Sequence, residues 1–192
     1  MHFEYLYKML RLLTFLSLLV CVSCGDNKPE TSDQEANISE ETVTASHEGH
    51  HHPDVPMYSF DELEAEVLSR KDGTTYVVNF WATWCKPCVK ELPAFESLHA
   101  NYKDQNVKVV LVSLDFPENM NTKVLPFIER RALQSQVVLL ADDDANTWIP
   151  KVDENWDGAI PVTLIFKDDE RHFYDRSFEY EELEQELSLI HI

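Results

Sequence analysis

The sequence has few basic residues. Lysine and arginine together number 16 against 35 aspartates and glutamates, and the formal net charge at pH 7 is -19. Because proteins bind nucleic acid mainly through Lys and Arg contacts to phosphates, this shortage excludes nucleic acid as an expected partner. The acidity itself is typical of a solvated surface that keeps a protein soluble.

Cysteine is also scarce, and a long apolar run is absent. Four cysteines in 192 residues are too few for a small fold held together by disulfides. The apolar run at residues 12–20 is interrupted by Thr14 and Ser17, and it falls well short of the ~20 residues that span a bilayer. The hydrophobic content of 44% is enough for a packed core, and the length favours one domain with a tail.

Residues 1–24 have the features of an export signal. Lys8 and Arg11 give a positive start, the apolar run follows, and the segment ends in the letters CVSCG at residues 21–25. This ending resembles the lipobox of bacterial lipoproteins, in which the cysteine becomes the lipidated first residue of the mature chain. The resemblance implies lipidation of Cys24 and a lipid-anchored protein on the periplasmic face of a bacterial membrane.

Residues 25–56 are rich in acidic residues, Ser, Thr, Asn and Pro, with few large apolar side chains. Such a segment cannot bury enough surface to offset the entropy of ordering, so we expect a flexible tether. Four histidines in this segment are weak candidates for binding copper, nickel or zinc: His47, His50, His51 and His52. Because a tether gives such ligands no fixed geometry, we assign neither a metal nor a cofactor to the protein.

Residues 57–192 alternate between strand and helix signals. Ser59 and Glu62 have the spacing of a capping box, which predicts a helix from there to about residue 70. Short apolar, β-branched runs predict buried strands, and apolar residues at helical spacing predict helices. This alternation implies an α/β fold with a central mixed sheet flanked by helices. We expect strands at 76–81, 107–114, 137–140, 162–166 and 171–175, and helices over 92–102, 119–133 and 179–189.

The stretch WATWCKPCVKELPAF at residues 81–95 places two cysteines between a strand and a helix. Cys85 then lies at a helix N-terminus, where free backbone N–H groups and the helix dipole favour a thiolate over a thiol. Such positions lower a cysteine pKa to roughly 3.5–7.5 from about 8.5, and the thiolate is the nucleophile. Lys86 adds a positive charge, Pro87 is tolerated in a first helical turn, and we expect both to tune the redox properties of the pair.

This pattern predicts thiol–disulfide exchange. Cys85 would attack a substrate disulfide, and Cys88, one turn further into the helix, would resolve the mixed disulfide. A static disulfide is one alternative, and half of a metal site is another, although the domain contains no second CxxC or CxxH. A different function, copper handling, would use the cysteine pair to hold Cu(I) and the histidine tract to collect it. Peroxiredoxin-like activity fits poorly, because a CxxC pair has no role in that chemistry.

The motif FWATWCKPC resembles the thioredoxin active site, and the string VVNFWATWCKPCVKELPAF is similar to the TlpA-like branch of exported thiol–disulfide oxidoreductases. The resemblance covers about residues 57–190 and implies a thioredoxin fold. It further implies that Pro161 follows a cis peptide bond and faces the cysteines. The backbone of Ile160 would pair with the substrate chain, and Trp84 would shield the cysteine pair on one side.

The same resemblance implies which residues could take part in proton transfer. Thioredoxin carries a buried Asp six residues before the first cysteine, and this chain has Asn79 there, which cannot titrate. Glu91, three residues after Cys88, matches an acidic position of the TlpA-like branch and could handle the proton that Cys88 must lose. A solvated helix glutamate is the alternative interpretation.

The family resemblance implies a membrane-tethered reductase of protein disulfides outside the cytoplasm, for example on apocytochrome cysteines in cytochrome c maturation. A membrane electron donor would restore the dithiol. The direction of exchange is not determined by the sequence, since ~30 mV in a two-electron couple equals only ~1.4 kcal/mol.

A second acidic pattern, Asp142-x-Asp144-x-Asn146, begins like a calcium loop. It has Thr147 where such a loop needs glycine, and Asp153 where it needs a bidentate glutamate. We therefore interpret it as an acidic helix cap or loop.

Overall fold

The computed structural model describes residues 55–191. Within them, one sheet has the strand order β1-β4-β3-β2-β5-β6. The first four strands in that order are parallel, β5 is antiparallel to β2, and β6 is antiparallel to β5, so the sheet is mixed as predicted. The strands are β1 (Met57–Tyr58), β2 (Thr75–Trp81), β3 (Val107–Ser113), β4 (Gln136–Leu140), β5 (Val162–Lys167) and β6 (Glu170–Tyr174).

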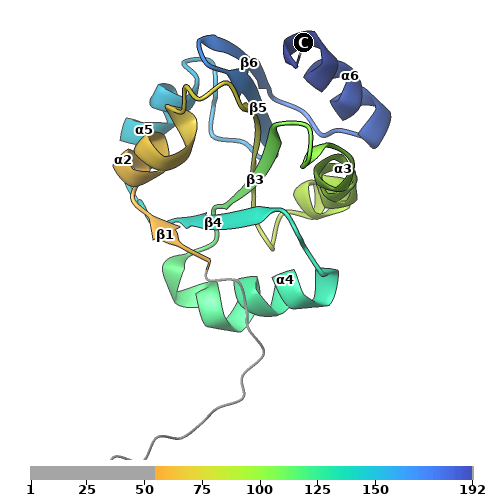
Figure 1. The fold of residues 1–192 in the computed structure, drawn as a ribbon. Helices are drawn as coiled ribbons and strands as arrows, with labels where there is room; N and C mark the ends of the chain where they lie inside the picture. Colours follow the sequence, from red (N-terminus) through yellow and green to blue (C-terminus); the bar gives the residue numbers. More distant parts are fainter. Residues whose placement is uncertain (1–54, 192) are drawn as a thin grey trace, which may run out of the picture. The chain divides into compact units, whose positions relative to one another are not determined.

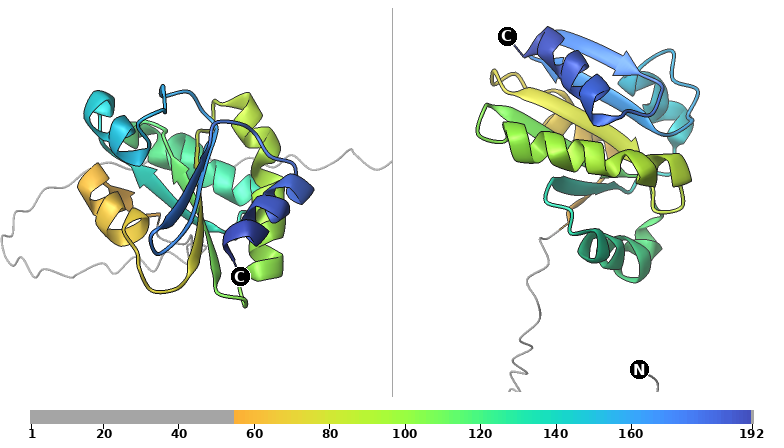
Figure 2. Two further views of the ribbon diagram at one scale, coloured as in Figure 1. Left: turned by 90° about the horizontal axis from the view of Figure 1, so that it is seen from above. Right: turned by 90° about the vertical axis from the view of Figure 1, so that its right-hand side faces the viewer.

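Helices cover both faces of this sheet (Figures 1 and 2). One face packs against α3, α4 and α6, and the opposite face packs against α2 and α5. The helical segments are α2 (Phe60–Leu63) with the π-helical turn η1 (Glu64–Leu68), α3 (Lys86–Tyr102), the turns η2 (Pro117–Asn119) and η3 (Met120–Val124), α4 (Leu125–Arg131), α5 (Ala145–Val152) and α6 (Tyr180–Ile190).

The central strands are mostly apolar because both faces of the sheet are covered. Successive residues of a strand point to opposite faces. In β2, Val77 and Trp81 accordingly join the core under α3, whereas Val78 and Phe80 join the core under α2 and α5. This two-sided burial explains why apolar residues occupy successive positions of these strands instead of alternating with polar ones.

The predicted helix start at Ser59 is confirmed. The Ser59 hydroxyl accepts a hydrogen bond from the Glu62 backbone N–H, and the Glu62 carboxylate accepts one from the Ser59 N–H. The structure also contains elements that the sequence patterns did not predict, namely β1 and α5. The acidic pattern, interpreted as a helix cap or loop, places Asp144 at the N-cap position of α5, although its side chain accepts no hydrogen bond from the backbone of the helix.

The folded part of the chain includes residues that the sequence placed at the end of the tether. Val55 packs against the core, and the carbonyl of Pro56 accepts a hydrogen bond from the Leu139 N–H. The predicted signal at 1–24 and the histidine tract lie outside the described residues. In the part of the chain that the structure describes, no helix is long and apolar enough to cross a membrane.

Candidate active site

Cys85 and Cys88 lie where β2 gives way to α3, as predicted. Cys85 is the N-cap residue of α3, its N–H donates to the carbonyl of Ala82, and a proline occupies the first helical turn. The two cysteines form a disulfide, with their Cα atoms 5.3 Å apart. Cys85 is 5% exposed and Cys88 is fully buried. Cys88 is therefore the more buried of the two, as expected, but Cys85 is also less exposed than a helix start suggests.

The Cys85 sulfur has polar backbone groups on two sides. The N–H of Cys88 donates to it over 3.3 Å, and the carbonyl oxygen of Ile160 lies 3.7 Å away. The first of these contacts is the kind of helix N-terminal N–H that stabilises a thiolate. Lys86 and Pro87 are exposed beside the pair, and Trp84 is 61% exposed.

The segment before β5 brings the substrate-binding candidates to the cysteines. The Ile160–Pro161 peptide bond is cis, which confirms the implication of the family resemblance. Pro161 is buried, and Ile160 is half-buried and packs against both core clusters. The carbonyl of Ala159, just before them, accepts a hydrogen bond from the Trp156 indole N–H over 2.7 Å. The indole thus holds this segment in place next to Cys85.

Glu91 points inward from α3 and is 4% exposed. Its Oε1 accepts a hydrogen bond from the Asn79 side-chain amide and its Oε2 accepts one from the Phe178 backbone N–H, each over 2.9 Å. Burial raises the pKa of Glu91 from its ordinary 4.5 to about 7, against the opposing effect of the two hydrogen bonds. The alternative of a solvated glutamate is therefore wrong, and the carboxyl can gain or lose a proton near neutral pH.

Asn79 has a role at the site that its sequence position did not reveal. Its amide nitrogen donates to Glu91 and also to the Thr163 hydroxyl over 3.2 Å, so it ties β2 to α3 and β5. The amide oxygen is buried and has no hydrogen-bond partner among the described residues. The sequence marked Asn79 only as a position that cannot titrate.

A second polar contact holds the loop that precedes Cys85. The N–H and the hydroxyl of Thr83 both donate to the carboxylate of Asp115, over 2.8 and 2.6 Å, and the Ser113 hydroxyl donates to it over 2.9 Å. Asp115 is 1% exposed. The segment that follows β3 therefore supports the loop before Cys85, and no local sequence pattern indicated this.

The structure does not test the histidine tract as a metal site, because the described residues begin after it. Between residues 55 and 191, no group of three or more His, Cys, Asp or Glu side chains is arranged to hold a metal ion. The histidine tract, His47 and His50–His52, precedes this range.

Comparisons with known proteins agree with this geometry. Residues 49–171 match the AhpC/TSA family. Two proteins named thiol-disulfide oxidoreductase ResA are similar in sequence. The one from Oceanobacillus iheyensis is 41% identical over 69 residues, and the one from Halalkalibacterium halodurans is 32% identical over 113 residues. These alignments cover 33% and 58% of this chain, and the chain spans only 36% and 59% of the length of those relatives.

Solved structures extend the agreement to the fold. A thioredoxin-related protein from Neisseria meningitidis serogroup B has a TM-score of 0.52 and 25% identity, covering 64% of this chain and 88% of that one. A thiol:disulfide interchange protein of the thioredoxin family from Chlorobium tepidum has a TM-score of 0.53 and 17% identity, covering 72% and 97%. The chain therefore belongs to the AhpC/TSA family and has the thioredoxin-like fold that its cysteine motif predicted.

Proposed function

We propose that the protein is a thiol–disulfide oxidoreductase that reduces protein disulfides through Cys85 and Cys88. The observation that carries the proposal is the disulfide at the N-terminus of α3, with the Cys85 sulfur held between the Cys88 N–H and the Ile160 carbonyl. The names of the ResA relatives support the same chemistry.

The reaction proceeds by two exchanges. In the reduced protein, the Cys85 thiolate attacks one sulfur of the substrate disulfide, which forms a mixed disulfide and releases the other substrate sulfur as a thiolate. The Cys88 thiolate then attacks the Cys85 sulfur and releases the second substrate thiolate. The substrate gains two electrons, and the protein retains the Cys85–Cys88 disulfide. An external dithiol must supply two electrons to restore the reduced form.

Glu91 would handle the proton of this second step. The Cys88 thiol must lose its proton before it attacks, and a carboxyl with a pKa of about 7 is matched to proton transfer near neutral pH. Lys86 and Pro87 would tune the stability of the reduced pair through charge and through the geometry of the first helical turn.

The substrate chain would bind beside the cysteines. We infer that it pairs with the backbone of Ile160 next to Pro161, because this segment lies against the Cys85 sulfur. Trp84 offers an exposed aromatic surface at the same place, which suits contact with a partner protein.

The cellular location of the protein is inferred from its sequence alone, because the predicted export signal lies outside the residues that the structure describes. We propose that Cys24 is lipidated and that the chain is exported to the periplasmic face of a bacterial membrane, where the domain acts on protein disulfides. Its electron donor would then be a membrane dithiol protein, and cysteines of apocytochrome c are a candidate substrate class. Disulfides persist in such compartments, which is where a reductase of this kind is needed.

A trapping experiment tests the proposed function. The full chain with Cys88→Ser should reduce no disulfide peptide catalytically but should accumulate a mixed disulfide on Cys85, because the resolving sulfur is absent. Cys85→Ser should accumulate none. Mass spectrometry of the unreduced products measures both. A Cys88→Ser variant that forms no adduct, while the wild type also fails to reduce the peptide, would overturn the assignment.

A further inference from the structure

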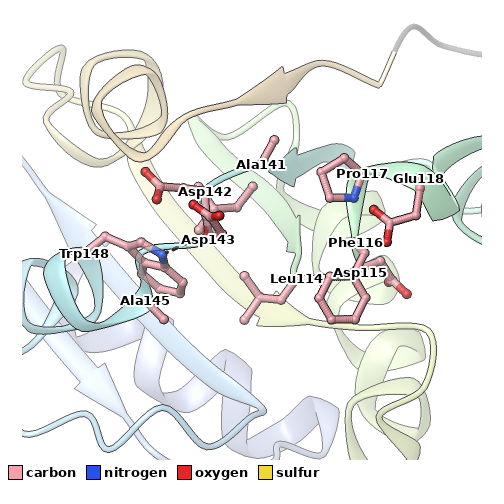
Figure 3. Close-up of a pocket in the computed structure, with 11 residues that line it drawn as sticks. Leu114, Asp115, Phe116, Pro117, Glu118, Ala141, Asp142, Asp143, Ala145 and Trp148 are labelled. Atoms are coloured by element: carbon pink, nitrogen blue, oxygen red, sulfur yellow. Dashed lines mark hydrogen bonds between the residues drawn. The ribbon is translucent and has the colours of Figure 1, made fainter.

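A groove lies beside the active-site loop, at the ends of β3 and β4. It has a volume of about 710 Å³ and is lined by the segments that follow these strands and by the start of α5. Figure 3 shows the side chains of Phe116, Pro117 and Glu118 on one side of it and those of Asp142 and Trp148 on the other. The proposed exchange at the cysteine pair assigns no role to these residues.

The groove lies next to the loop that leads to Cys85. Its wall residue Asp115 accepts the two hydrogen bonds from Thr83, two residues before Cys85. Leu114, another wall residue, donates its backbone N–H to the carbonyl of Trp81 at the end of β2 over 2.8 Å. The groove therefore adjoins the end of β2 and the loop that leads into the Cys85 position.

The surface of the groove combines apolar and acidic groups. Phe116 is 64% exposed, although it is a large apolar side chain, and Leu114 and Trp148 continue the apolar lining. No lysine, arginine or histidine is among the lining residues. The groove therefore favours a positively charged ligand with an apolar side chain.

Two of its carboxylates are free to bind such a ligand. The Asp115 carboxylate is occupied by Thr83 and Ser113, and the Asp142 carboxylate accepts the backbone N–H groups of Phe60 and Asp144. Glu118 and Asp143 are exposed, and neither has an ion pair or hydrogen bond from its side chain within residues 55–191.

We propose that this groove binds an extended segment of the substrate protein that flanks its disulfide. The segment carries a Lys or Arg that pairs with Glu118 and Asp143, next to an apolar side chain that contacts Phe116. This inference rests on the proposed function and adds a substrate class to it: cationic proteins with an apolar residue close to the reactive cysteine.

The test compares two disulfide peptides that are identical except for Lys or Glu beside a leucine near the cysteine. The reduced full-length protein reduces each, and every rate is divided by the rate of the same variant with a small neutral disulfide, 2-hydroxyethyl disulfide. We expect the second-order rate constant of this single turnover to be about 5-fold higher for the Lys peptide, since two exposed ion pairs contribute modestly. The ratio should approach 1 in 1 M salt, where the Debye length is only about 3 Å.

Matched variants separate the effect of the groove on the Lys preference from the effect of the overall acidity of the chain. Glu118→Gln with Asp143→Asn should abolish the Lys preference. Asp104→Asn with Glu181→Gln makes the same change in net charge at exposed positions outside the groove and should keep the preference. Phe116→Ala should lower the normalised rates of both peptides, because both carry leucine.

The outcomes distinguish this proposal from the proposed function. Failure to reduce even the small disulfide would remove the oxidoreductase assignment. Reduction of the small disulfide with equal normalised rates for both peptides would leave that assignment intact and overturn the groove. A Lys preference that falls equally in both double variants would also overturn the groove, because the general field of the protein would then be its source.

Discussion

At the scale of single residues, the buried carboxyl of Glu91 makes the stability of the fold depend on pH. Its carboxyl is buried, and both hydrogen-bond donors that reach it, the Asn79 amide and the Phe178 N–H, are neutral. Neutral donors offset only part of the cost of removing a carboxylate from water. The folded protein therefore holds a proton on Glu91 over a pH range in which the unfolded chain has lost it.

We predict that the free energy of unfolding of the oxidised protein falls as the pH rises from about 4.5 to about 7, relative to that of Glu91→Gln. The pKa of Glu91 is raised on folding, so its stabilising contribution is complete below the unfolded pKa of 4.5 and is lost as the pH passes the folded pKa of about 7. The full difference corresponds to about 3 kcal/mol. Urea unfolding at several pH values measures it.

The exposed substitution Glu181→Gln serves as a control and should leave the pH profile unchanged. A proton-transfer role adds a second readout, because Glu91→Gln should also flatten the pH dependence of mixed-disulfide resolution by Cys88. Parallel stability profiles for the wild type and Glu91→Gln would contradict the account of this residue.

At the scale of elements, the end of β3 supports the loop that leads into α3. Asp115→Ala should lower the free energy of unfolding by about 2 kcal/mol, because it leaves the Thr83 N–H and the Ser113 hydroxyl without their acceptor. It should also slow disulfide exchange, since the loop before Cys85 loses its support. Denaturation and exchange assays check both, with the exposed Asp104→Ala as the control. Unchanged exchange would show that the loop is held by other contacts.

The elements also show what a sequence can predict. The strands β2, β3 and β5 were predictable because burial on both faces makes them mostly apolar. By contrast, β1 has only two residues and forms because it pairs with β4, and α5 is short and contains Pro150. The strand β1 therefore depends on a tertiary contact, and the proline within the short α5 weakens its local helix signal.

Some features of the candidate site were likewise predictable from the sequence, and others were not. The cysteine pair was predictable, because the strand–CxxC–helix order places Cys85 at a helix start. Its low exposure was not, since the Ile160 segment that lies against its sulfur comes 75 residues later in the chain. The contacts Asn79–Glu91 and Thr83–Asp115 likewise join different elements, so neither leaves a pattern within one segment.

At the scale of the whole molecule, the sequence predicts a domain attached to a membrane by lipid on Cys24. The full chain produced in a bacterial cell should incorporate a labelled fatty acid, because acylation of Cys24 attaches it. The chain should also sediment with membranes, since two or more acyl chains anchor a protein stably. Cys24→Ser should do neither, whereas the matched Cys21→Ser should do both. Membrane association without label in the wild type would contradict lipidation.

The central claim for the whole protein is that Cys85 is an activated nucleophile. The most direct test is the rate at which iodoacetamide alkylates the reduced full-length chain at pH 6.5, with the modified cysteine identified by peptide mass spectrometry. A thiol whose pKa is lowered at a helix N-terminus should react at Cys85 about 10-fold faster than free cysteine under the same conditions. A Cys85 rate no higher than that of free cysteine, with no exchange against a model disulfide, would contradict the account.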